Sequence, residues 1–104
     1  MEQIAFTMHL KPGVSKEYKK RHDEIWPEML SALKEAGVSD YSIFLDEESG
    51  ELFAVLRRSE NHGMDEMPEK AIVQKWWEWN APLMDVKPDN EPISKPLLPV
   101  FHMA

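Results

Sequence analysis

The sequence of 104 residues contains no cysteine, so neither disulfide bonds nor thiolate chemistry can contribute to its fold or function. Basic residues are few as well: 12 Lys and Arg stand against 19 Asp and Glu, and the formal net charge at pH 7 is −7. Binding to phosphate backbones and to anionic membrane surfaces depends on clustered Lys and Arg. The charge balance therefore argues against nucleic acid and membranes as partners.

Long apolar runs and signature motifs are also missing. No segment approaches the length of a membrane span, and the first residues lack the basic and apolar regions of a secretion signal, which predicts a cytoplasmic protein. There is no G-x-G-x-x-G, P-loop or G-x-S-x-G motif, and the histidines fit no metal-ligand spacing. We therefore expect neither a metal nor a cofactor.

The residues that are present fit a soluble globular domain. The chain is 42% hydrophobic and 30% charged, which is the usual balance of a folded protein with one modest core. A chain of this length is expected to form a single domain, residues 1–104.

Hydrophobic periodicity predicts a definite order of elements. Residues 4–10 alternate as a strand, and residues 14–36 carry a helical apolar stripe that Gly37 should end. Pro27 should kink or split this helix near Trp26. Residues 41–45 and 52–57 form a predicted hairpin, residues 68–80 a second helix with Pro68 in its first turn, and residues 97–103 a last strand. The pattern β-α-β-β-α-β predicts a ferredoxin-like α+β fold, an antiparallel sheet with helices on one face.

The predicted hairpin is apolar on both of its faces. In residues 52–57, Leu52 and Leu56 lie on one face and Phe53 and Val55 on the other. In residues 41–45, Phe44 lies on the face opposite to that of Ile43 and Leu45. Because two helices can cover only one face of a four-stranded antiparallel sheet, the other face needs a partner. A homodimer is the simplest partner.

Tyr18, His22 and Trp26 are spaced four residues apart, so they lie along one side of the predicted helix. An imidazole can give and take protons near neutral pH, and aromatic walls with a few polar tips suit a small polar ligand such as a sugar. His22 is therefore a candidate general acid–base. The alternative is a structural helix histidine whose ring is satisfied by a neighbour.

Three further aromatic residues are candidates for the same site. Trp76 and Trp77 are adjacent on the second helix, and Tyr41 opens the second strand. An indole can stack on the C–H face of a sugar while its N–H donates a hydrogen bond. The alternatives are core packing and dimer contact for the tryptophans, and ordinary strand-edge packing for Tyr41.

Over nearly its whole length the chain resembles the L-rhamnose mutarotase family. The resemblance rests on a set of short segments, namely Ala5-Phe6 with Met8, Tyr18 with Arg21-His22, Ile25-Trp26-Pro27-Glu28, Tyr41 before Ile43 and Leu45-Asp46, Leu52-Phe53-Ala54, Trp76-Trp77, Pro88-Asp89-Asn90, Pro92 and Val100-Phe101. It implies a ferredoxin-like α+β homodimer of the dimeric α/β-barrel type.

The resemblance also implies a chemistry and a site. His22 would be the proton donor, and Tyr18, Tyr41, Trp76 and Trp77 would line the site for L-rhamnose or a related aldose. Mutarotation opens and recloses the cyclic hemiacetal and requires no cofactor. The catalytic base is left open between a tyrosine and a bound water. The alternative function is a non-catalytic dimeric α+β module that binds a small ligand or regulates, because fold alone does not decide function.

Overall fold

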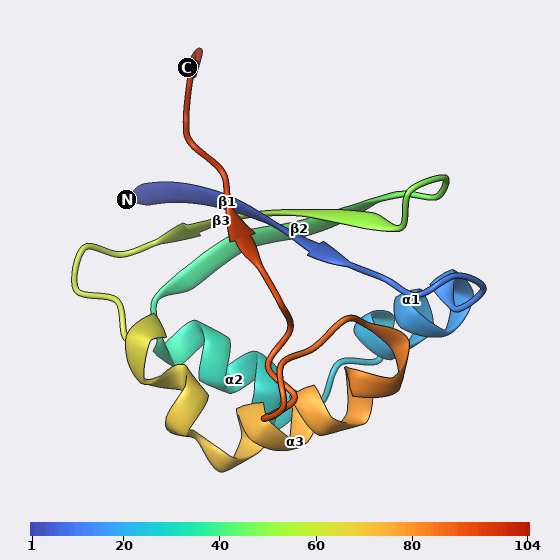
Figure 1. The fold of residues 1–104 in the computed structure, drawn as a ribbon. Helices are drawn as coiled ribbons and strands as arrows, with labels where there is room; N and C mark the ends of the chain where they lie inside the picture. The colour runs from blue at the N-terminus through green and yellow to red at the C-terminus, as the bar shows by residue number, and fades with distance from the viewer.

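The computed structural model describes residues 1–104 and contains a four-stranded sheet with helices on one of its faces (Figure 1). The elements in chain order are β1 (Glu2–His9), α1 (Ser15–Asp23), α2 (Pro27–Glu35), β2 (Val38–Asp46), β3 (Glu51–Arg58), the 3-10 helix η1 (Met64–Glu69), α3 (Ala71–Asn80), the 3-10 turn η2 (Ala81–Leu83) and β4 (Lys95–Pro96). None of these helices combines the length and the apolar character that crossing a membrane demands.

The sheet is antiparallel throughout and has the strand order β2-β3-β1-β4. This order and the order of elements along the chain confirm the predicted α+β arrangement, with α1, α2 and α3 together beneath the sheet in Figure 1.

The sequence correctly predicts a break in the first helical segment. Pro27 is the first residue of α2, where its missing N–H costs nothing, so the segment forms two helices of nine residues instead of one kinked helix. Gly37 ends α2 with a φ of +86°, as expected of a residue just past a helix. A Cβ at this position would lie 2.2 Å from Oγ of Ser59, so glycine is required on steric grounds too.

Two predicted boundaries are wrong. Pro68 lies inside the 3-10 helix η1, and α3 begins only at Ala71, because Lys70 has extended backbone angles and interrupts the helical path. The last strand is Lys95–Pro96 and not residues 97–103. Residues after Leu97 make no backbone hydrogen bond, so their apolar composition alone does not create a strand within one chain.

The core lies between the sheet and the helices. Leu52, Ala54 and Leu56 of β3 are at most 1% exposed and point toward the helices. Two groups of buried side chains pack there, one under α2 and α3 that includes Trp76, the other under α1 and η2 that includes Tyr18. The predicted site residues therefore belong to the layer that joins helices to sheet.

Candidate active site

The last two turns of α1 hold the central pair of the site. Tyr18 is buried, and the rings of Tyr18 and His22 are stacked with their centroids 4.1 Å apart and an interplanar angle of 29°. Nδ1 of His22 lies 2.8 Å from the backbone oxygen of Tyr18. Because a carbonyl oxygen can only accept, Nδ1 carries the proton, and Nε2 of the neutral ring keeps its lone pair.

Helix α3 brings Trp76 against this pair. The centroids of His22 and Trp76 are 5.3 Å apart and their planes meet at 72°. The rings of Trp26 and Trp76 are 5.1 Å apart and meet at 78°. These are edge-to-face contacts, the arrangement that aromatic rings prefer. Trp26 is the residue before α2 and not part of α1, so tertiary packing and not helical spacing brings it to the cluster.

A β-bulge aims Tyr41 into the same layer. Ser39 pairs with Arg57 and Ser42 with Val55, so Asp40 and Tyr41 together oppose the single residue Leu56. Asp40 adopts a φ of +48°, which absorbs the extra residue. The Tyr41 ring lies 6.4 Å from the ring of Phe6, whose strand neighbour Ala54 faces the helices. The bulge therefore turns Tyr41 toward the site.

Arg21 fastens α1 to the end of α3. Its guanidinium carbon lies 3.8 Å above the ring of Trp79, its Nη1 donates to the Trp79 backbone oxygen, and its Nε donates to Glu17 at 2.7 Å. The last carbonyl groups of a helix have no partner within the helix, so Arg21 satisfies one of them. The residue next to His22 thus fixes the helix that carries Trp76.

The surroundings of His22 favour the neutral imidazole. Burial lowers its pKa below the ordinary value of 6.5, while the hydrogen bond to Tyr18 and the nearby Asp23 carboxylate oppose that shift. The ring is therefore mostly uncharged at neutral pH, with Nε2 free to accept a proton.

The two tyrosines stay protonated at neutral pH. Burial raises the pKa of Tyr18 well above 10, and the neighbouring Tyr41 raises it further. Tyr41 is 37% exposed as a residue, yet protein surrounds its phenol closely enough that burial raises its pKa to about 12. Neither hydroxyl makes a hydrogen bond within the chain. Both can donate to a ligand, whereas neither supplies a phenolate base near pH 7.

The predicted site residues do not all meet. The structure brings Tyr18, His22 and Trp76 into direct contact and Tyr41 next to Tyr18, whereas Trp77 is partly buried against the core and shares no ring contact with them. The alternative for Trp76, core packing, also holds, since it is 7% exposed. The alternative for His22, a structural ring satisfied by a neighbour, holds for Nδ1, which donates to the backbone oxygen of Tyr18.

Two polar residues near the cluster had no role in the sequence analysis. Arg21 could have been found from its place beside His22, but its contact with Trp79 spans 58 positions of the sequence. Asn80 follows Trp76 by one turn, is 3% exposed and donates from Nδ2 to the Trp76 backbone oxygen. Its Oδ1 is a buried acceptor without a partner in the chain.

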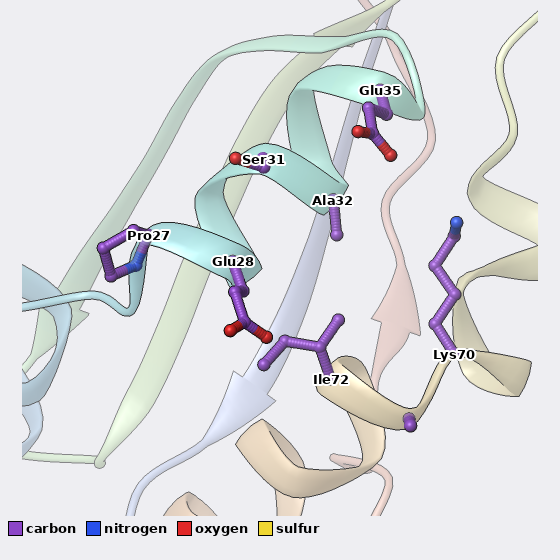
Figure 2. A pocket seen from close by; sticks show the side chains of 8 residues that line it. Pro27, Glu28, Ser31, Ala32, Glu35, Lys70 and Ile72 are labelled. Carbon is purple, nitrogen blue, oxygen red and sulfur yellow. The ribbon is translucent and has the colours of Figure 1, made fainter.

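A pocket elsewhere on the helical layer is distinct from this cluster. A hollow of about 530 Å³ lies between α2 and the start of α3. Figure 2 shows Glu35 and Lys70 on opposite sides of it. Its lining carries no aromatic ring and none of the predicted site residues. It offers no flat surface for a sugar. No group of three or more His, Asp and Glu side chains gathers closely enough to bind a metal ion.

The fold and these contacts together define a class: a small α+β domain in which a neutral histidine, two protonated tyrosines and an indole gather between the helices and the sheet. A family model described as L-rhamnose mutarotase matches residues 3–103. The chain belongs to the L-rhamnose mutarotase family.

Similar proteins span the same length. The chain is 58% identical over 103 residues to an L-rhamnose mutarotase of Mesorhizobium japonicum, covering 99% of this chain and 98% of the relative. It is 55% identical to one of Sinorhizobium fredii, with both chains covered completely. The crystal structure of an L-rhamnose mutarotase from Formosa agariphila superposes with a TM-score of 0.93 at 46% identity over the full length of both chains.

Proposed function

We propose that the protein is an isomerase that interconverts the α and β anomers of L-rhamnose by acid–base opening and closing of the sugar ring, with the whole chain, residues 1–104, acting as one domain. The observation that carries the proposal is the agreement of full-length family membership with a free imidazole nitrogen among aromatic side chains. The family membership and the free imidazole nitrogen are both needed, because a fold by itself does not specify a reaction.

In this proposal His22 moves the proton. Ring opening requires loss of the proton from the hydroxyl at the anomeric carbon and protonation of the ring oxygen. His22 is the proton donor to the ring oxygen, and because its ring is neutral at pH 7 it must first receive a proton. The anomeric hydroxyl supplies this proton, since both tyrosine hydroxyls hold theirs. The same steps in reverse close the ring on either face of the aldehyde.

The remaining predicted residues would bind the sugar. Tyr18 and Tyr41 offer hydroxyl donors and acceptors, and Trp76 and Trp77 offer indole surface for the C–H faces of the ring. Rhamnose is a 6-deoxy sugar, and its methyl group suits an apolar contact. A missing or added hydroxyl is discriminated strongly only where the site hydrogen-bonds it, so an aldose that differs at a hydroxyl bound by Tyr18 or Tyr41 should be a much slower substrate than one that differs elsewhere.

The protein in this proposal works as a homodimer through the face of the sheet that the helices leave uncovered, here called the open face. Phe44 and Phe53 pair directly across β2 and β3 on this face and are 66% and 41% exposed, with Val55 beside them. A patch of this kind marks an interaction site, and a two-fold axis lets one surface complement itself.

Saturation-transfer NMR tests the activity. Saturating the anomeric proton of α-L-rhamnose should reduce the signal of the β anomer in proportion to the exchange rate, and catalytic amounts of protein should raise that rate above the spontaneous one. A panel of aldoses in the same experiment reports specificity. Sugar binding without faster exchange would support the non-catalytic binding module instead. Exchange at the spontaneous rate with every sugar would refute the proposal.

A further inference from the structure

β2 contains one residue more than β3 can pair with, and the surplus lies at Asp40. The register of the two strands shifts between Ser39 and Ser42. Asp40 and Tyr41 therefore stand together opposite the single residue Leu56. The φ of Asp40 is +48°, in the left-handed region that glycine enters freely and most other residues avoid. A residue with this backbone angle is what the G1 type of β-bulge requires at its first position.

The side chain of Asp40 does not account for its place in the bulge. Its carboxylate is 77% exposed, and Oδ2 lies 3.9 Å from Nε of Arg57, whose side chain is 45% exposed. An ion pair this long between solvated groups contributes little to stability. Asp and Asn, however, enter the left-handed region more readily than other side chains do. The position therefore requires a backbone angle, and the carboxylate is incidental to it.

The bulge corrects the alternation of β2. Val38, ahead of the bulge, is buried in the core group beneath α2 and α3. Ile43, after the bulge, pairs with Ala54 and packs against the other core group. Residues an odd number of positions apart lie on opposite faces of a regular strand, so one extra residue is needed for both to face the helices. Tyr41 is the residue that this correction turns inward, with its ring edge-on to Phe6 at 6.4 Å.

The bulge also places Tyr41 near Tyr18, which comes from a different element, α1. Protein surrounds both phenols, and Tyr41 is close enough to raise the pKa of Tyr18. Each residue of a strand advances the chain by about 3.3 Å, so loss of the bulge would move Tyr41 along β2 by up to that distance. A misplacement of about 1 Å is enough to impair the geometry of a site. The relation between the two phenols therefore depends on the extra residue.

We propose that Asp40 is a positioning residue: its left-handed backbone holds the bulge that places the hydroxyl of Tyr41 beside Tyr18 for contact with the sugar. Asp40 itself touches neither the sugar nor the reacting atoms. The inference rests on the proposed function, in which both tyrosines bind the sugar. It adds to that function a residue of the edge strand that determines how tightly the sugar is bound.

Substitutions at position 40 separate the backbone angle from the carboxylate. Asp40→Gly and Asp40→Asn keep access to the left-handed region, so the KM for L-rhamnose in the NMR exchange assay should stay within about twofold of the wild type. Asp40→Val should raise KM about tenfold, the equivalent of about one lost hydrogen bond, because a β-branched side chain does not tolerate this angle. Its kcat should fall less, since a binding contact acts on ground and transition states alike. A lower kcat for Asp40→Asn would overturn the inference, because the carboxylate would then act in the reaction.

Deletion of Asp40 tests the bulge without backbone strain. Tyr41 would then stand alone opposite Leu56 in a regular strand, and every other pair of β2 and β3 would be kept. This chain should fold, and its KM should again rise about tenfold, whereas an unchanged KM would refute the role of the bulge. Gly13→Val is the control for strain, because Gly13 has a φ of +79° and an added Cβ would meet no atom within 4 Å. It should lower the Tm and leave KM unchanged.

Tyr41→Phe completes a double-mutant cycle. Because the bulge acts through the Tyr41 hydroxyl, deletion of Asp40 should change KM by less than about twofold once that hydroxyl is absent. A further rise of about tenfold in this background would show a general structural effect of the deletion and overturn the positioning role. A wild-type protein that does not accelerate anomer exchange would overturn the proposed function and this inference with it. An active wild type whose KM is insensitive to the deletion would overturn the role of Asp40 alone.

Discussion

Replacing His22 with alanine should remove most of the catalysed anomer exchange. One positioned proton-transfer group contributes about 10²–10⁴-fold to a rate, which is about 3–5 kcal/mol of transition-state stabilisation. Removal of the proton from the anomeric hydroxyl and protonation of the ring oxygen would both depend on Nε2 of this ring, because the raised pKa values of Tyr18 and Tyr41 leave no phenolate to substitute at neutral pH. The loss should therefore appear in kcat more than in KM.

The same change should leave the fold intact. His22 makes one hydrogen bond, to the Tyr18 backbone oxygen, whose loss costs about 0.5–1.5 kcal/mol. Its stacking on Tyr18 and edge contact with Trp76 are worth about 0.5–1.5 kcal/mol each. The total, about 1.5–4.5 kcal/mol, is smaller than the usual range of about 5–15 kcal/mol for a folded domain. Circular dichroism and thermal unfolding should show a folded variant with a lower Tm.

The assay is saturation transfer between the anomeric protons of L-rhamnose, with the protein-free rate subtracted. His62→Ala is the control, because His62 contacts the backbone N–H of Met64 and not the aromatic cluster, so its exchange rate should be normal. A folded His22→Ala protein that exchanges anomers at nearly the wild-type rate would refute the proton path described above.

The pH dependence follows from the lowered pKa of His22: above it the ring is neutral and accepts a proton, so catalysed exchange should be level near neutral pH and fall as the pH drops through that pKa. A catalysed rate that rises on acidification over this range would contradict the path. Trp77→Ala should raise KM more than it lowers kcat, because stacking acts on ground and transition states alike, and an unchanged KM would count against its place in the site. Trp76→Ala should in addition cost about 3–5 kcal/mol of stability, measurable by denaturant unfolding, because Trp76 is 7% exposed. Arg21→Lys keeps the charge but loses the planar stacking on Trp79 and should lower kcat by up to about 10²-fold through misplacement of His22, with a wild-type kcat as the opposing result.

Several features could be read from the sequence because their causes are local. Alternation of side chains over Ile4 to Leu10 predicts the first strand, and β1 is found at Glu2–His9. Pro27 divides the first helical segment because a proline ring cannot occupy a helix interior without loss, and Gly37 ends it because only glycine adopts that backbone angle freely. The four-residue spacing of Tyr18 and His22 brings their rings together within a single helix.

Other features depend on residues far apart in the chain and were decided only by the tertiary structure. The bulge at Asp40 and Tyr41 interrupts the alternation of β2, so pattern alone does not indicate that both Val38 and Tyr41 face the helices. Trp76 and Trp77 are adjacent in the sequence, but only Trp76 contacts the ring of His22 in the folded chain, while Trp77 packs partly buried against the core.

The hairpin and the last residues of the chain show the same division between what the sequence determines and what the tertiary structure decides. The sequence by itself determined that the hairpin is apolar on both faces and that the last residues are apolar. Only the structure decided that Leu52 and Leu56 face the helices while Phe44 and Phe53 are exposed, and that the chain after Leu97 leaves the sheet. The physical reason is that hydrophobicity requires burial but does not specify the partner, which packing between distant segments selects.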